Sequence, residues 1–266
     1  MRPISLHHIM APDVSAAELA QIAAGLDCRH VCLFTQSPVA NWRFPVVDDD
    51  SMAELSQVMA DHQVTAYGIT SFAVQPGIDI SSYEAGLERG ARLGARYASV
   101  RIVDEDEARA ADAFGRLGEL ATRYDIVPSI EFTGFKAPEA LLRTLRILEA
   151  AAVGTLSIDP LHIVRSEASL EVMRRLDAAR IGYVQLCDGP LEATEEQYWR
   201  ESASERLPPG EGAFPLDEIL PLAPPGRPVS LEIPNERLRA EGVSPLLRAR
   251  RAVDATRRLL ARLEPS

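Results

Sequence analysis

Apolar positions along the chain follow two alternating spacings. Short runs of β-branched and other apolar residues alternate with longer stretches in which apolar residues recur every three or four positions. The first spacing predicts strands and the second predicts amphipathic helices. We expect eight strands, at 4–9, 30–34, 65–71, 98–102, 126–131, 155–159, 183–188 and 229–233. We expect helices at 15–25, 51–61, 82–93, 105–124, 137–152, 168–179, 215–220 and 244–263.

The order of these elements predicts a single-domain (β/α)8 TIM barrel over residues 1–266. Eight strand–helix pairs suit a fold that typically takes about 250 residues. A doubly wound open sheet is the alternative, but the first strand runs into HHIMAPDV rather than a glycine-rich phosphate loop. Residues 189–214 interrupt the regular spacing. We interpret them as a long polar loop without regular structure that lies over the active face.

Composition narrows the class of protein. A net charge of −11 and a pI near 5.0 argue against a nucleic-acid partner. Three cysteines without metal-site spacing indicate structural thiols in a reducing compartment. Neither a signal-peptide core nor an apolar run of membrane-spanning length is visible, so we expect a soluble cytoplasmic protein without a membrane partner.

Four of the last strands are predicted to end in oxygen donors. These residues are Glu131, Asp159, Gln185 and Glu232. Because the active site of a barrel is built at the carboxyl-terminal ends of its strands, we expect these side chains to converge. Three carboxylates in one place repel each other unless a cation neutralises them. The set predicts one divalent metal ion, with Mg²⁺ or Mn²⁺ favoured and Co²⁺ or Zn²⁺ as alternatives.

The stretch LSIDPLHIV adds a candidate base. His162 follows Asp159 by three residues, so it can reach the same site, and Pro160 ends the strand between them. A histidine that only caps the next helix is the structural alternative. Glu131 and Glu232 compete with His162 as the catalytic base.

Four further residues are candidates for binding substrate. Arg206 and Arg101 could bring positive charge to an anionic group, and His8 is one of two adjacent histidines of which at most one points into the barrel. Tyr67, like Trp42, could line a pocket. A loop or packing role is the alternative for each of them.

The segments IEFTGF, LSIDPLHI, YVQLCDGP, RLPPGEG and SLEIPNERLR together resemble the xylose-isomerase-like TIM-barrel superfamily of sugar phosphate isomerases and epimerases. The resemblance implies that Glu131, Asp159, Gln185 and Glu232 bind one divalent metal. Within this superfamily, the chain is most similar to the 3-dehydroshikimate dehydratases. The similarity lies in the Gln of VQLCDGP, in His162, in Arg206 before PPGEG and in the SLEI segment. Unlike that branch, the chain lacks an arginine after the third strand, where it reads YGITSFAVQPG.

The predicted function is a metal-dependent enzyme that removes a proton next to the carbonyl of a small keto-polyol or keto-acid. A 3-dehydroshikimate dehydratase-like lyase is favoured, and a ketose or sugar-phosphate 3-epimerase or isomerase is the alternative. An AP-endonuclease-like phosphodiesterase is a remote alternative, disfavoured by the charge of −11 and only five histidines. A barrel that only binds a ligand is a further alternative. The C-terminal helix could serve a homodimer.

Overall fold

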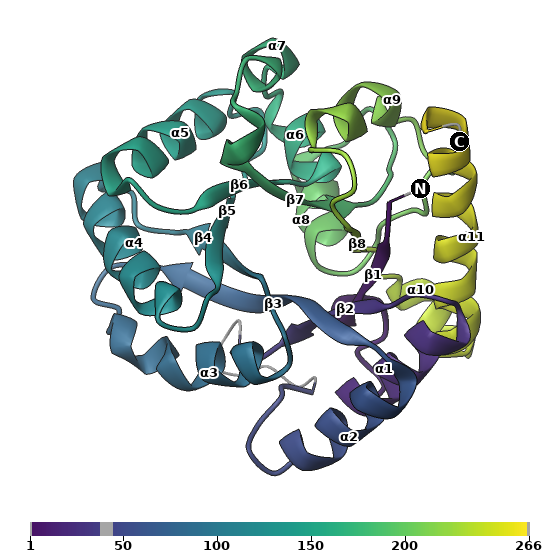
Figure 1. Ribbon diagram of the computed structural model, residues 1–266. Helices are drawn as coiled ribbons and strands as arrows, with labels where there is room; N and C mark the ends of the chain where they lie inside the picture. Colours follow the sequence, from purple (N-terminus) through teal and green to yellow (C-terminus); the bar gives the residue numbers. More distant parts are fainter. Residues whose placement is uncertain (1, 38–44, 265–266) are drawn as a thin grey trace.

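The chain forms a closed barrel of eight parallel strands (Figure 1). The computed structural model describes residues 2–37 and 45–264. The strands follow one another around the barrel in sequence order, and β1 closes the ring against β8. They are β1 (Ile4–His7), β2 (His30–Phe34), β3 (Thr65–Val74), β4 (Tyr97–Ile102), β5 (Val127–Glu131), β6 (Thr155–Ile158), β7 (Ile181–Leu186) and β8 (Val229–Leu231). The predicted (β/α)8 TIM barrel is confirmed.

Helices surround the barrel (Figure 1), and the longer ones bury apolar side chains in its core. They are α1 (Ala16–Gly25), α2 (Met52–His62), α3 (Glu84–Arg92), α4 (Glu107–Thr122), α5 (Glu139–Ala151), α6 (Pro160–Ser166), α7 (Leu170–Arg174), α8 (Glu195–Ala203), α9 (Leu216–Ile219), α10 (Glu236–Ala240) and α11 (Pro245–Leu263). Within the described ranges, none of them combines the length and apolarity needed to cross a membrane. The hydrophobic core therefore lies between the strands and the helices.

The helical prediction was wrong mainly in the second half of the chain. Residues 189–214 contain α8, which begins where Thr194 and Gln197 form a capping box. The helix expected at 168–179 is shorter, because α7 ends at Arg174 and a separate 3₁₀ turn follows. The short helices α6 and α10 were not expected.

The junction of β6 and α6 shows how the sequence ends a strand at a candidate ligand. Asp159 has extended backbone angles, and its Oδ1 accepts a hydrogen bond from the Leu161 N–H at 2.8 Å. Pro160 occupies the first turn of α6, where its missing N–H costs nothing and its fixed φ suits a helix. The helix then carries His162 back toward the strand ends.

A layer of aromatic and arginine side chains closes the amino-terminal end of the barrel. The Tyr97 and Tyr183 rings lie 5.4 Å apart, centroid to centroid, and Tyr183 is fully buried. Arg227 lies over the Tyr97 ring at 5.7 Å and donates a hydrogen bond to the Gly182 carbonyl at 2.7 Å. Because this end is filled, the opposite end of the barrel is where side chains can surround a ligand.

Asp188 anchors the segment that follows β7. Its buried carboxylate accepts hydrogen bonds from the backbone N–H groups of Gly210, Gly212 and Phe214 at 2.8, 3.1 and 3.0 Å. Asp188 also accepts from the N–H of the next residue at 2.8 Å. The far end of the segment is thus held against the end of β7.

Asp188→Ala should lower the free energy of unfolding by about 2–4 kcal/mol, because buried N–H groups lose a charged acceptor. Asp188→Asn keeps one carbonyl oxygen and should lose less. Denaturant unfolding measures both. The control is Asp217→Asn, whose side chain is exposed and should matter by less than about 0.5 kcal/mol. An Asp188→Ala protein as stable as the parent would contradict this anchoring.

Candidate metal and catalytic site

The four predicted metal ligands meet at the carboxyl-terminal end of the barrel. Glu131 ends β5, Asp159 follows β6, Gln185 lies near the end of β7 and Glu232 follows β8. None is more than 8% exposed. Three of them, together with His162, line a cavity of about 320 Å³, and Asp159 lies beneath it at 1% exposure. The structure therefore places together the donors that the strand ends predicted.

The donors retain free oxygen atoms. The Gln185 amide nitrogen donates a hydrogen bond to Glu232 Oε2, which leaves Gln185 Oε1 buried. Neither Gln185 Oε1 nor Glu131 Oε1 has a hydrogen-bond partner among the described residues. Donor atoms of Glu131, Asp159 and His162 lie within 4.8 Å of one another. Buried acceptors without partners are costly, so this arrangement fits a divalent cation.

Arg206 is the cation that the structure itself supplies to these carboxylates. The side chain is 2% exposed, and its Nη1 lies 2.8 Å from Asp159 Oδ2 and 3.6 Å from Glu232 Oε2. Its Nε donates to the Glu201 carbonyl at 3.1 Å and its Nη2 to the Ser202 carbonyl at 3.4 Å, at the end of α8. Arg206 was predicted to bind substrate, with an exposed loop position as the alternative; it follows α8 and is buried between that helix and the donors.

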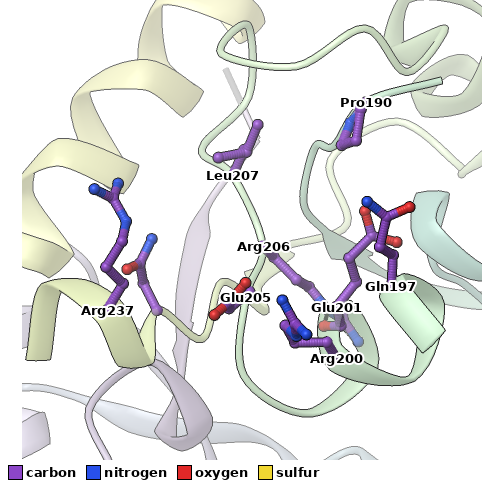
Figure 2. Close-up of a pocket in the computed structure, with 9 residues that line it drawn as sticks. Pro190, Gln197, Arg200, Glu201, Glu205, Arg206, Leu207 and Arg237 are labelled. Carbon is purple, nitrogen blue, oxygen red and sulfur yellow. Dashed lines mark hydrogen bonds between the residues drawn. The ribbon is translucent and has the colours of Figure 1, made fainter. Parts of the chain in front are cut away.

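A second, outer cavity of about 250 Å³ lies on the other side of Arg206, between α8 and α10 (Figure 2). Arg200 and Arg237 line it, and each is paired within its own helix, with Glu196 and Glu241. Arg206 thus separates this outer cavity from the donors.

The charges in the site shift the pKa values of its acids. Burial, followed by the charges of Glu232 and Asp159, raises the pKa of Glu131 well above its usual range. Burial also raises the pKa of Glu232, although Arg206 opposes the shift. For Asp159, burial acts in the same direction, but Arg206, His162 and the Leu161 N–H together outweigh it, so the pKa is lowered. Without a metal, the two glutamates therefore hold protons to a higher pH than ordinary carboxyls do.

His162 is oriented by a hydroxyl on α8. Its Nε2 lies 3.8 Å from Glu131 Oε1 and 3.7 Å from Asp159 Oδ2, and its Nδ1 lies 3.2 Å from the Tyr198 hydroxyl. Burial lowers the pKa of His162, which favours the neutral ring. The Tyr198 oxygen accepts from the Gly134 N–H at 3.0 Å, so its own proton is available to Nδ1. If His162 carries its hydrogen on Nε2, that N–H faces the carboxylates. Nδ1 is then free to accept the hydrogen bond from the Tyr198 hydroxyl.

Arg101 lies where the prediction placed it. At the end of β4 it is paired in register with Glu131 of β5, and it lines the 320 Å³ cavity. It makes no hydrogen bond or ion pair with any residue in the described ranges, in contrast to Arg206.

Two predicted substrate-binding residues do not line this cavity. His8 follows β1, is 1% exposed, and its Nε2 lies 3.0 Å from the Val14 carbonyl oxygen. Tyr67 belongs to the aromatic layer at the other end of the barrel, with its ring centroid 5.4 Å from that of Tyr97. Trp42 lies outside the described residues.

His7, rather than its neighbour, lines the cavity. Ser5 pairs in register with Ser230 of β8, so His7, two residues on, lies level with Glu232. Burial lowers the pKa of His7 to about 3, so the ring is neutral. The alternation of side chains along a strand could have identified His7 once the pairing register was known.

The sequence did not predict α8, which forms one wall of the 320 Å³ cavity. Tyr198 and Trp199 line the cavity, and Trp199 is 58% exposed at its mouth. The helix is fastened to α6 by a buried ion pair, Arg165 Nε to Glu201 Oε2 at 2.7 Å. A composition rich in polar residues hid this helix, because its anchoring side chains come from elsewhere in the chain.

Comparisons with known proteins agree with the fold. The model of a family described as xylose isomerase-like TIM barrel matches residues 20–259. No curated protein matches the chain in sequence. A xylose isomerase domain protein from Alicyclobacillus acidocaldarius superposes with a TM-score of 0.76 at 16% identity, over 98% of this chain and 99% of that one.

Two further solved structures are similar. The IolI protein with a zinc atom gives a TM-score of 0.80 at 15% identity, over 99% of this chain and 100% of that one. A D-allulose 3-epimerase from Methylomonas sp., in complex with D-allulose, gives 0.67 at 13% identity, over 97% of both chains. At these identities, the likeness concerns the fold.

Metal binding should release protons. Because the pKa values of Glu131 and Glu232 are raised, a divalent ion must displace protons from them, and affinity should rise with pH until both are ionised without metal. Calorimetric titration with Mn²⁺ in two buffers of different ionisation enthalpy measures the number of protons released. Affinity that stops rising at the pH where an ordinary exposed glutamate is already ionised would contradict the shifts.

Tyr198→Phe should leave the fold intact but remove two hydrogen bonds, the one that orients His162 and the one from the Gly134 N–H. The variant keeps the ring packing on Phe135 but removes the hydroxyl that faces Nδ1. We expect the midpoint of thermal unfolding to fall by only a few degrees, as for a loss of about 1 kcal/mol. Nitrogen NMR of the histidine ring should show the Nε2–H form in the parent and a mixture in the variant. The Nδ1–H form in the parent would refute the assignment.

Proposed function

The chain belongs to the xylose isomerase-like TIM barrel family, and from this premise we propose that it is a metal-dependent enzyme that removes a proton next to a substrate carbonyl. The substrate is a small polyhydroxylated keto compound. The observation that carries the proposal is the convergence of four buried oxygen donors in which Glu131 Oε1 and Gln185 Oε1 have no partner among the described residues.

Glu131, Asp159, Gln185 and Glu232 would hold one divalent ion. Three carboxylates and an amide suit Mg²⁺ or Mn²⁺, and the zinc atom of the IolI structure keeps Zn²⁺ among the candidates. When bound, the ion would act as a Lewis acid that makes the neighbouring carbon acidic, a contribution of several kcal/mol.

A glutamate is better placed than His162 to take the proton. With hydrogen on Nε2, neutral His162 presents a donor toward the cavity. The other tautomer would point Nδ1–H at a Tyr198 oxygen that already accepts a hydrogen bond from the Gly134 N–H. We therefore assign the base to Glu131 or Glu232, and to His162 the donation of a hydrogen bond to a substrate oxygen.

Dehydration is the favoured outcome. The glutamate that takes the α-proton can return it to a β-hydroxyl, which leaves as water and creates a carbon–carbon double bond. The setting of Gln185 in VQLCDGP, which resembles the 3-dehydroshikimate dehydratases, supports this lyase reaction. Such a keto-acid is the substrate that we would test first.

Epimerisation or isomerisation is the second candidate, and the position of the glutamates favours it. Glu131 and Glu232 come from β5 and β8, so one could remove a proton and the other return it to the opposite face. The D-allulose 3-epimerase among the similar structures fits this alternative.

The first experiment is a substrate screen on protein stripped with chelator and then reloaded. Turnover of 3-dehydroshikimate, an inosose and ketohexoses is followed with and without Mn²⁺, Mg²⁺ or Zn²⁺. Ultraviolet absorbance of the new double bond identifies dehydration, and chromatography identifies an epimer. Metal-independent turnover would refute the proposal.

Glu131→Gln and Glu232→Gln should each lower kcat by at least about 10²-fold, since each removes a metal ligand and a candidate base. Both should also bind Mn²⁺ more weakly in calorimetry. Glu149→Gln, an exposed change on α5, is the matched control and should leave both quantities unchanged. Glutamine variants as active as the parent would be incompatible with the assigned roles.

A further inference from the structure

Two arginines line the cavity, and only one is free to bind a ligand. Arg206 already donates to Asp159 and to the backbone at the end of α8, and it is 2% exposed. Arg101 is partly exposed and has no hydrogen-bond or ion-pair partner within residues 2–37 and 45–264. A guanidinium presents five donors, so Arg101 can offer several hydrogen bonds to a ligand in the cavity.

The surroundings of Arg101 are built for a polar ligand. Thr70 and Ser71 of β3 and Thr133 after β5 line the same cavity. In the described part of the chain, none of these three hydroxyls makes a hydrogen bond. Two aromatic side chains, Tyr198 and Trp199, also line the cavity. One side of the cavity therefore offers a cation and free hydroxyls, next to the metal donors.

The charge count also favours an anion. With a divalent ion in place, Glu131, Asp159 and Glu232 contribute three negative charges. The ion contributes two positive charges, and Arg206 and Arg101 contribute one each, so the site carries one net positive charge. A monoanion balances this charge, whereas a phosphate dianion would reverse its sign.

We propose that the substrate is a keto acid rather than a neutral keto-polyol, and that Arg101, with the hydroxyls of Thr70 and Ser71, binds its carboxylate. This inference rests on the proposed function, because it places the carboxylate beside the carbonyl that the metal donors face. Arg101 is then the residue that determines specificity, and Arg206 is not.

Binding of unreactive ligands tests this without turnover. The probes are gluconate and quinate, with sorbitol and quinic acid methyl ester as their neutral counterparts, titrated calorimetrically into metal-free and Mn²⁺-loaded protein. At least one acid should bind both forms about tenfold more tightly than its counterpart, because a guanidinium–carboxylate pair is lost in the neutral ligand. Sorbitol 6-phosphate should bind more weakly than gluconate.

Arg101→Gln should weaken acid binding about tenfold and leave the neutral ligands within about twofold. Arg101→Lys keeps the positive charge but lacks the planar guanidinium. Its affinity for the acids should lie between those of the parent and of Arg101→Gln. Arg96→Gln, an exposed change just before β4, is the matched control and should bind like the parent.

Each contrary result has a definite meaning. Acids that bind no better than their neutral counterparts, or an acid preference that survives Arg101→Gln, would overturn the inference, and so would tighter binding of the phosphate ester. If Arg101→Gln abolishes the acid preference while no keto compound turns over with any metal, the anion site stands and the proposed function fails. If a neutral ketose turns over and Arg101→Gln does not affect its turnover, the proposed function stands and the anion site fails.

Discussion

Burial of three carboxylates in one place is the constraint that the site depends on. Arg206 is the side chain that partly neutralises them. Carboxylates removed from water repel each other and lose hydration, so each requires a proton, a cation or hydrogen bonds. Arg206 provides a cation to Asp159 at 2.8 Å and to Glu232 at 3.6 Å. Because the same side chain binds the end of α8, the electrostatics of the site and the placement of its outer wall depend on one residue.

Arg206 does not complete the site. It forms no ion pair with Glu131, whose Oε1 is buried without a partner among the described residues. The raised pKa of Glu131 reflects this, since burial and the charges of Glu232 and Asp159 outweigh the opposing charges of Arg206 and Arg101. A divalent ion would replace the proton on Glu131. Structure and reactivity are thus linked, because the residue that is hardest to keep ionised is also a candidate base.

The parts of the molecule that could be predicted from sequence are those that local patterns determine. Alternating spacings identified the barrel, and donors at successive strand ends identified Glu131, Asp159, Gln185 and Glu232, because parallel strands present their last residues at the same end. The choice between His7 and His8 depends on strand register, which no local pattern reveals. Helix α8 and the burial of Arg206 depend on contacts such as the Arg165–Glu201 ion pair between distant segments, so a polar stretch was mistaken for a loop.

The most direct test of the central claim is a crystal structure of the protein soaked in Mn²⁺, with data collected at a wavelength where manganese scatters anomalously. We expect one anomalous peak, within bonding distance of Glu131, Asp159, Gln185 and Glu232, with Arg206 still beside Asp159. No peak at this position, or a metal bound through His162 Nε2 with Gln185 turned away, would contradict the account.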